Sequence, residues 1–294
     1  MRISERQIYD SGSLRLARQR EVLAEKTEQA SSGRRVTTAA SDPVAAALLE
    51  RNDATAGRAS SIARSTGAAD ADLLAVDGAL GSAASILEDT LSLAVQMANG
   101  TFTGVDRAGA ALQAEQNLKA FVAALNIEQD GRFLLGGTNQ SQPPFRSDGT
   151  YGGDDGARKL EVAPGLFEEV SVRADVGVAG QPSGINIPAA FLALRDALAT
   201  NNEGDIRASI EVFHQSVAQL GTLRSDVGSK SVMLQSARST SLAVYDAAQR
   251  SSAEAGDADI ATTATELSLA ERAFEAAAQA TAHSFRQTLL NTLR

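Results

Sequence analysis

The chain has 294 residues, no cysteine, two histidines and a formal net charge of −9. The absence of cysteine excludes disulfides, thiolate metal sites and cysteine nucleophiles, and the negative charge argues against binding to nucleic acid. No segment approaches the roughly 18 consecutive apolar residues of a membrane span, and the N-terminus lacks the apolar core of a secretory signal, so we expect neither membrane insertion nor a cleaved signal peptide.

A polar helix is predicted at the N-terminus, within residues 1–40. Four residues recur every seven positions and form a thin seam: Tyr9, Leu16, Leu23 and Ala30. The helix should break at Ser31-Ser32-Gly33, because these residues favour turns. Residues 1–40 hold eight basic and five acidic residues, a net charge of +3.

Long helices are predicted on both sides of the middle of the chain. Asp42 can cap a helix that Pro43 begins, and the periodic pattern then continues to Asn99. A further helix should start near Asp106 and stop at Gly131. After residue 189 the helical pattern resumes, first in a short piece to Thr200 and then in a second long run that ends near residue 253.

Residues 132–188 differ from the rest, because they contain five of the six prolines of the chain. Arg132–Leu135 is predicted as a strand. Two further strands, Lys159–Val162 and Leu166–Val172, flank Pro164-Gly165, which is a hairpin signal. The sequence therefore predicts a small β-rich insertion with one modest core of its own.

The last helix, residues 267–293, carries its apolar residues on one face. These include Leu267, Phe274, Phe285, Leu289 and Leu293. Burial of these few large side chains is not enough to stabilise an isolated helix of this length in water. We therefore expect the C-terminal helix to need partner helices. Residues 254–294 carry three basic and six acidic residues, a net charge of −3, which suits packing against the basic N-terminal helix.

The predicted fold is mainly α: a long antiparallel helical rod, coiled-coil-like, with the N- and C-terminal helices paired at one end. We expect three domains: an assembly domain of residues 1–40 plus 255–294, a rod of residues 41–131 plus 189–254, and the insertion 132–188. The expected assembly interface contains the seam residues of both ends: Ile3, Ile8, Leu16, Leu23, Leu267, Phe274, Phe285, Leu289 and Leu293.

No motif in the sequence indicates catalysis, so we expect no enzyme, no cofactor and no metal. His214 and His283 are far apart, and neither has the histidine spacing of a zinc site. The loop 148–156 is rich in Asp and Gly but lacks the spacing of a calcium loop, so a set of turns is the simpler interpretation. An enzyme hidden in the insertion 132–188 stays a minor alternative.

Several stretches resemble the flagellin family. The residues Arg2-Ile3-Ser4 are similar to the N-terminal residues of these proteins. A second stretch of the family, with one Asp missing here, is similar to Gly33-Arg34-Arg35-Val36 followed by Ala40-Ser41-Asp42-Pro43. Residues 87–99 are similar to its rod-helix sequence. Residues 125–137, with Pro144-Phe145 and the segment 149–154, resemble the entry to the β domain of its hook-associated members, which flagellins usually lack.

The resemblance implies a structural adaptor of the bacterial flagellum, which joins the hook, through another hook-associated protein, to the flagellin filament. It implies partners as well: other flagellar axial proteins, copies of the chain in a ring, and an export chaperone at the C-terminal helix. The implied location is extracellular, after type III export without a cleaved signal peptide. A filament-forming flagellin of the same fold is the alternative.

Overall fold

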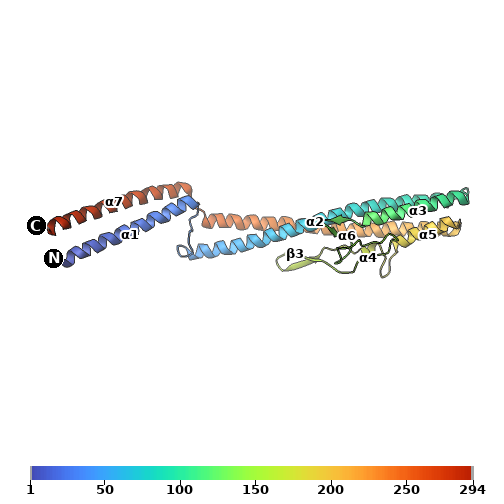
Figure 1. Ribbon diagram of the computed structural model, residues 1–294, viewed down its shortest axis with the longest axis horizontal. Helices are drawn as coiled ribbons and strands as arrows, with labels where there is room; N and C mark the ends of the chain where they lie inside the picture. The colour runs from blue at the N-terminus through green and yellow to red at the C-terminus, as the bar shows by residue number, and fades with distance from the viewer. Residues whose placement is uncertain (1, 293–294) are drawn as a thin grey trace. The chain divides into compact units, whose positions relative to one another are not determined.

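The computed structural model describes residues 2–292, with side chains from Gln7 to His283 apart from Ile8 and Tyr9. Most of the described chain is helical, and the strands are few and short (Figure 1). In chain order the elements are α1 (Arg2–Ser32), α2 (Pro43–Met97), α3 (Gly104–Leu125), β1 (Glu128–Gln129), β2 (Arg132–Phe133), β3 (Lys159–Ala163), β4 (Leu166–Glu169), α4 (Ala174–Gly177), α5 (Ile187–Ala199), α6 (Glu203–Gly256) and α7 (Ile260–Thr292). The predicted class, mainly α with a small β-containing insertion, is confirmed. Its arrangement as a coiled-coil-like rod stays a prediction.

Local signals set most helix ends where the sequence predicts them. Gly33 takes a φ of 68° directly after α1, a backbone conformation that glycine adopts without a steric penalty. At the start of α2, Asp42 Oδ1 accepts a hydrogen bond from the Ala45 N–H at 3.0 Å. The helix α5 begins similarly, because Asn186 Oδ1 accepts from the Ala189 N–H at 3.0 Å.

Both predicted ends of α3 need correction. Thr103, not Asp106, is the residue before the first turn, and the two form a reciprocal capping box. The helix ends at Leu125 rather than at Gly131, because the chain turns into the small hairpin β1–β2, in which Asp130 and Gly131 both have positive φ.

The insertion is mostly loops and turns. Its two sheets each contain two antiparallel strands, β1–β2 and β3–β4. The hairpin β3–β4 forms around Pro164-Gly165 as predicted, but β4 stops at Glu169 instead of reaching Val172. None of the described helices is long and apolar enough to cross a membrane.

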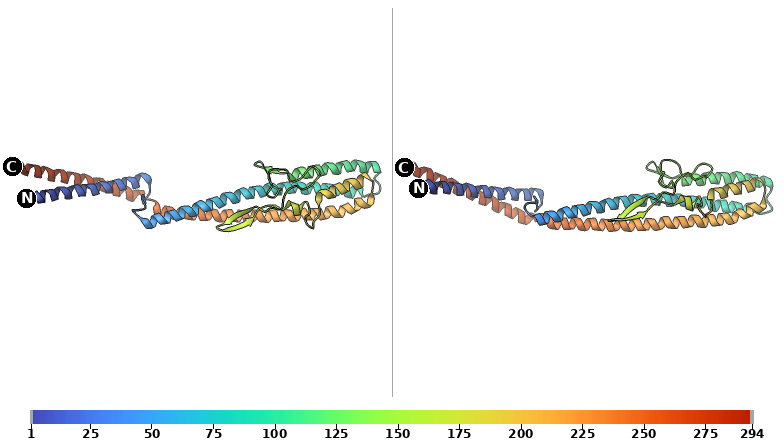
Figure 2. Two further views of the ribbon diagram at one scale, coloured as in Figure 1. Left: turned by 60° about the horizontal axis from the view of Figure 1, so that its bottom comes forward. Right: turned by 90° about the horizontal axis from the view of Figure 1, so that it is seen from below.

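The chain divides into two compact units. One contains residues 1–58 and 243–294, and the other contains residues 59–242. The helices α2 and α6 contribute to both units, whereas α1 and α7 belong to the first unit and α3, α5 and the insertion to the second. Within the first unit, α1 and α7 lie side by side (Figures 1 and 2).

Two antiparallel helices form the frame of the unit 59–242. Ser231 on α6 donates to the buried Asp70 on α2 at 2.5 Å, and Arg224 Nε donates to Asp77 at 3.1 Å. Since the residue numbers rise on α2 as they fall on α6, the helices run in opposite directions. Helices α3 and α5 pack together over this frame, where three rings contact in sequence: the centroids of Phe121–Phe191 and of Phe191–Phe213 are each 5.2 Å apart.

The insertion shares the core of these helices and does not form the separate core that the sequence predicts. Leu135, Phe145 and Val162 are buried in one cluster with side chains of α2, α3, α5 and α6. Ionic contacts add to this packing, because the carboxylate of Asp72 on α2 lies 3.1 Å from Arg158 and 3.6 Å from Arg132. The insertion is therefore attached to α2 by two arginines as well as by apolar contacts.

Arg107 joins three chain segments at one end of the unit 59–242. Its side chain is buried, and Nε donates to the Met97 carbonyl at 3.0 Å while Nη2 donates to the Asn99 carbonyl at 3.2 Å. Nη1 donates to Asn201 Oδ1 at 2.6 Å, and Nη2 pairs with Glu203 at 2.9 Å. Arg107 lowers the pKa of the Glu203 carboxyl. This one guanidinium thus connects the end of α2, the start of α3 and the loop before α6.

Tyr151 should make the unit less stable at high pH. Its hydroxyl donates to the Leu135 carbonyl at 3.1 Å, and burial raises its pKa from 10.0 to about 12, with further contributions from Asp175 and Asp154. The folded state therefore keeps a proton that the unfolded state loses, and stability present below pH 10 is lost as the pH rises toward 12. We expect the melting temperature to fall more steeply across this range in the wild type than in Tyr151→Phe. Parallel curves for the two proteins would contradict this.

Candidate assembly interface

The two terminal helices are tied together where α1 ends and α7 begins. The Arg35 N–H donates to the Gly256 carbonyl at 2.7 Å, and the Ala258 N–H donates to the Gly33 carbonyl at 2.9 Å. Arg34 and Asp257 form an isolated antiparallel β-bridge between these bonds. We call residues 33–36 with 255–258 the backbone joint. It brings the first and last helices to one place although more than 200 residues separate them.

The Arg35 side chain reinforces the backbone joint. Nη2 donates to the Ala255 carbonyl at 2.6 Å, near the end of α6, and Nη1 pairs with Asp42 at 3.0 Å. Asp42 also accepts from the Ala45 N–H, and these interactions lower the pKa of its carboxyl, the Ala45 bond most and Arg35 next. The ion pair between Arg35 and Asp42 therefore joins the Gly33–Val36 and Asp42-Pro43 stretches, both of which carry the family resemblance.

The predicted seam lies between α1 and α7 where side chains are described. Leu16 and Leu23 on α1 and Leu267 and Phe274 on α7 are half-buried. Ala270 and Thr281 are buried on the α7 side. Ile3, Ile8, Phe285 and Leu289 have no described side chains, and Leu293 lies outside the described residues. Whether these nine residues form an assembly interface stays a prediction.

The seam departs from its predicted pattern near the end of α1. Ala30 is exposed, and the neighbouring Gln29 is buried instead. The Gln29 amide donates to the Arg35 carbonyl at 3.0 Å and accepts from Lys26 Nζ at 3.1 Å. Lys26 in turn pairs with Glu266 on α7 at 2.7 Å. Sequence periodicity missed Gln29, because a polar residue that satisfies its hydrogen bonds can replace an apolar one.

The helix pair leaves apolar side chains in contact with solvent. Leu14 and Val22 on α1 are 54% and 41% exposed, and Leu269 on α7 is 58% exposed. A groove of about 650 Å³ runs along α1 and reaches α7, and we call it the α1 groove. Its lining residues are Ser13, Leu16, Ala17, Arg20, Glu21, Ala24 and Phe274. Two helices alone do not enclose a core, so this surface is the best candidate for contact with another protein.

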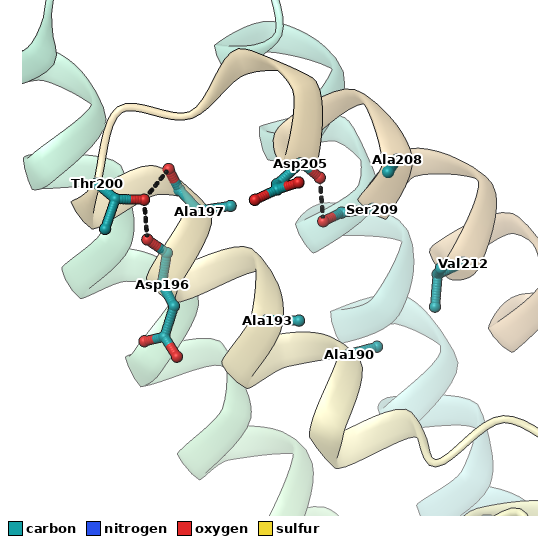
Figure 3. A pocket seen from close by; sticks show the side chains of 9 residues that line it. All are labelled: Ala190, Ala193, Asp196, Ala197, Thr200, Asp205, Ala208, Ser209 and Val212. Atoms are coloured by element: carbon teal, nitrogen blue, oxygen red, sulfur yellow. Dashed lines mark hydrogen bonds between the residues drawn. The ribbon is translucent and has the colours of Figure 1, made fainter.

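A second hollow, between α5 and α6, offers no reactive group (Figure 3). It measures about 440 Å³, and four of its nine lining residues are alanines. Its hydroxyl groups are used within the helices, since Thr200 donates to the Asp196 carbonyl at 2.8 Å and Ser209 donates to the Asp205 carbonyl at 2.9 Å. The hollow therefore contains no nucleophile paired with a base.

The residues weighed as metal ligands or catalysts lie apart. His214 and His283 are both exposed, and the described residues contain no group of three or more acidic, His or Cys side chains that could bind a metal ion. In the loop 148–156, Asp148 accepts from the Thr150 N–H at 2.9 Å, and Asp154 accepts from the N–H groups of Thr138 and Gly156 at 2.7 and 2.9 Å. These carboxylates form turns, and their hydrogen bonds lower the pKa of both.

The chain is similar to known flagellar proteins in sequence and in fold. Residues 3–140 match the family model of the bacterial flagellin N-terminal helical region. A Vibrio parahaemolyticus protein assigned as a flagellar hook-associated protein is 18% identical, with a TM-score of 0.66 over 74% of this chain and 100% of that chain. Hook-associated protein-3 of Legionella pneumophila is 13% identical, with a TM-score of 0.58 over 69% of this chain and 97% of that chain. FlgL of Bacillus cereus is 16% identical, with a TM-score of 0.56 over 68% of this chain and 96% of that chain. No curated protein matches the chain.

The match to the flagellin family therefore covers residues 3–140, just under half of the chain. Over 68–74% of its length the chain has the fold of FlgL-type hook-associated proteins, as the resemblance in its sequence implies. Two of these relatives are described as flagellar hook-associated proteins. These relatives are structural proteins; the absence of catalysis in this chain stays a prediction.

Proposed function

We propose that the chain is an adaptor of the bacterial flagellum, which joins the hook, through another hook-associated protein, to the flagellin filament. The observation that supports this most is the open pair of terminal helices, α1 and α7. They contact each other along a narrow seam, and the α1 groove and exposed apolar residues such as Leu14 and Leu269 remain uncovered. A neighbouring subunit can cover these surfaces. The fold shared with hook-associated proteins supports a position at the hook.

In this proposal the terminal residues 1–40 and 255–294 form the assembly domain. Residues 41–131 with 189–254 form the rod, and residues 132–188 form an outward insertion. The chain reaches the extracellular appendage unfolded, by type III export, and a chaperone binds the C-terminal helix before export. The lack of cysteine fits such a route, because no disulfide has to form after export. The partners are flagellin, a second hook-associated protein and copies of the chain in a ring.

A filament-forming flagellin is the second candidate, and the match of residues 3–140 to the flagellin N-terminal region favours it. Self-polymerisation separates the two functions. We expect the purified full chain to form no long filaments, because an adaptor needs the hook-associated partner as a template. Electron microscopy of the protein under conditions in which flagellin from the same bacterium polymerises would check this. Long filaments of the chain alone would contradict the adaptor function.

A further inference from the structure

We propose that neighbouring copies of this chain meet through unlike faces of the α1–α7 pair: an apolar and basic stripe on α1 of one copy enters the α1 groove of the next copy. This inference rests on the proposed function and names the surfaces and the partner that would build the ring. The observations are the spacing of exposed side chains, the position of the groove and the charges beside each.

The first face, which we call the arginine stripe, consists of Leu14, Arg15, Arg18 and Val22. At 3.6 residues per turn, Leu14, Arg18 and Val22 follow one another along one flank of α1. Among the described side chains of α1, Leu14 and Val22 are the two large apolar ones that project into solvent. Among the described side chains, neither Arg15 nor Arg18 has an ion-pair partner. The arginine stripe is therefore an apolar surface with two available positive charges.

The second face is the α1 groove, on the other flank of α1. Ala17 and Ala24 are small and exposed and lie seven residues apart, so they follow one another along the helix. Phe274 of α7 contributes to the lining and is half-buried. The hollow thus exists because small side chains of α1 stand beside the larger residues of the seam.

The charge beside the α1 groove is mainly negative. Glu21 is one of its lining residues, although Arg20 is another. On α7, Glu271 and Glu275 lie three residues before and one residue after Phe274, which places both on the groove side of that helix. Both are exposed and have no ion-pair partner among the described residues. They can pair with Arg15 and Arg18 of another copy.

The spacings of the two faces are similar. At about 1.5 Å per residue, Leu14 and Val22 are about 12 Å apart along α1, and Ala17 and Ala24 are about 10.5 Å apart. Two projecting side chains of one copy can therefore enter beside two alanines of the next. Contact between like faces would instead place arginines against arginines, which is repulsive.

After one contact between unlike faces, one copy keeps a free α1 groove and the other keeps a free arginine stripe, so further copies can add at both ends. Such heterologous contacts repeat, and they generate a ring or a helical assembly according to the rotation between copies. A contact between like faces would stop at a dimer. The inferred contact therefore has the symmetry that a tubular appendage requires.

Crosslinking can test this directly, because the natural chain has no cysteine. Two full-length variants with different affinity tags, Val22→Cys and Ala24→Cys, would be produced together in cells that lack the natural gene. Isolated flagella would then be treated with a short bis-maleimide. We expect a product that contains both tags, and none when either variant is the sole copy. The matched control replaces Val22→Cys with Glu28→Cys, an exposed position one helical turn beyond Ala24 and away from the arginine stripe, and should lose the product.

Each outcome has a defined meaning. A product from Val22→Cys alone would indicate contact between like faces and would overturn the inference. Swimming cells without the mixed product, or with equal product in the control, would overturn the inference while the proposed function stands. Flagella that do not contain the chain at all would count against both.

Discussion

Replacing Arg107 with alanine is expected to destabilise the unit 59–242 by about 3 kcal/mol. The buried guanidinium donates to the carbonyls of Met97 and Asn99 and to Asn201. Its loss removes the donor from these acceptors, of which the Met97 carbonyl belongs to a buried residue, and it leaves a cavity in place of a side chain that is 1% exposed. The measurement is the free energy of unfolding of the full chain in urea, followed by circular dichroism.

A matched control is available in Arg195→Ala. Arg195 pairs with the adjacent Asp196 at 2.6 Å and lies near the surface, so its loss should cost less than about 0.5 kcal/mol. Equal effects of the two substitutions would show that Arg107 contributes no more than an ordinary surface charge. The variant Arg107→Lys should be intermediate, because an ammonium group keeps the charge but lacks the fork of donors that reaches three segments.

Ending the chain after Asp259 is expected to abolish its incorporation into flagella while the melting temperature of the unit 59–242 changes little. The truncation removes α7, and with it the partner of α1 and the Phe274 side of the α1 groove. The core around Phe121, Phe191 and Phe213 contains none of the described side chains of α7. Differential scanning calorimetry and the amount of chain in isolated flagella are the two measurements.

The full-length chain expressed at the same cellular level is the control for this truncation. Loss of incorporation together with an unchanged main transition would support an assembly role for α7. If the truncated protein instead loses its main cooperative transition, then α7 belongs to a single core and the assembly proposal is wrong. Normal incorporation would contradict it as well.

Short-range chemistry explains which parts of the fold the sequence predicts well. Asp42-Pro43 and Gly33 act within a few residues of their own positions, so they set the boundaries of α1 and α2 wherever the rest of the chain lies. The turn at Pro164-Gly165 is local in the same way. At α3, the sequence indicates a cap at Asp106, and Thr103 is its reciprocal partner.

Contacts between distant segments explain what the sequence does not predict. Arg107 bonds to Asn201 and Glu203, which are 94 and 96 residues away, and nothing beside Arg107 in the sequence identifies these acceptors. The apolar residues of the insertion looked sufficient for one small core, yet they pack with four helices. In the candidate interface, the leucines of the seam were predictable from periodicity, whereas the α1 groove depends on Phe274 from the other end of the chain.

The joint between the first and last helices has an evolutionary consequence. Two of its links are main-chain bonds, from the Arg35 and Ala258 amides to the carbonyls of Gly256 and Gly33. Carbonyls and amides are supplied by nearly every amino acid, so drift at positions 34, 257 and 258 can proceed while the connection persists. Proline at position 35 or 258, which lacks the N–H, is the replacement that lineages should avoid there. Divergent relatives can therefore retain the backbone joint although few of their residues are identical there.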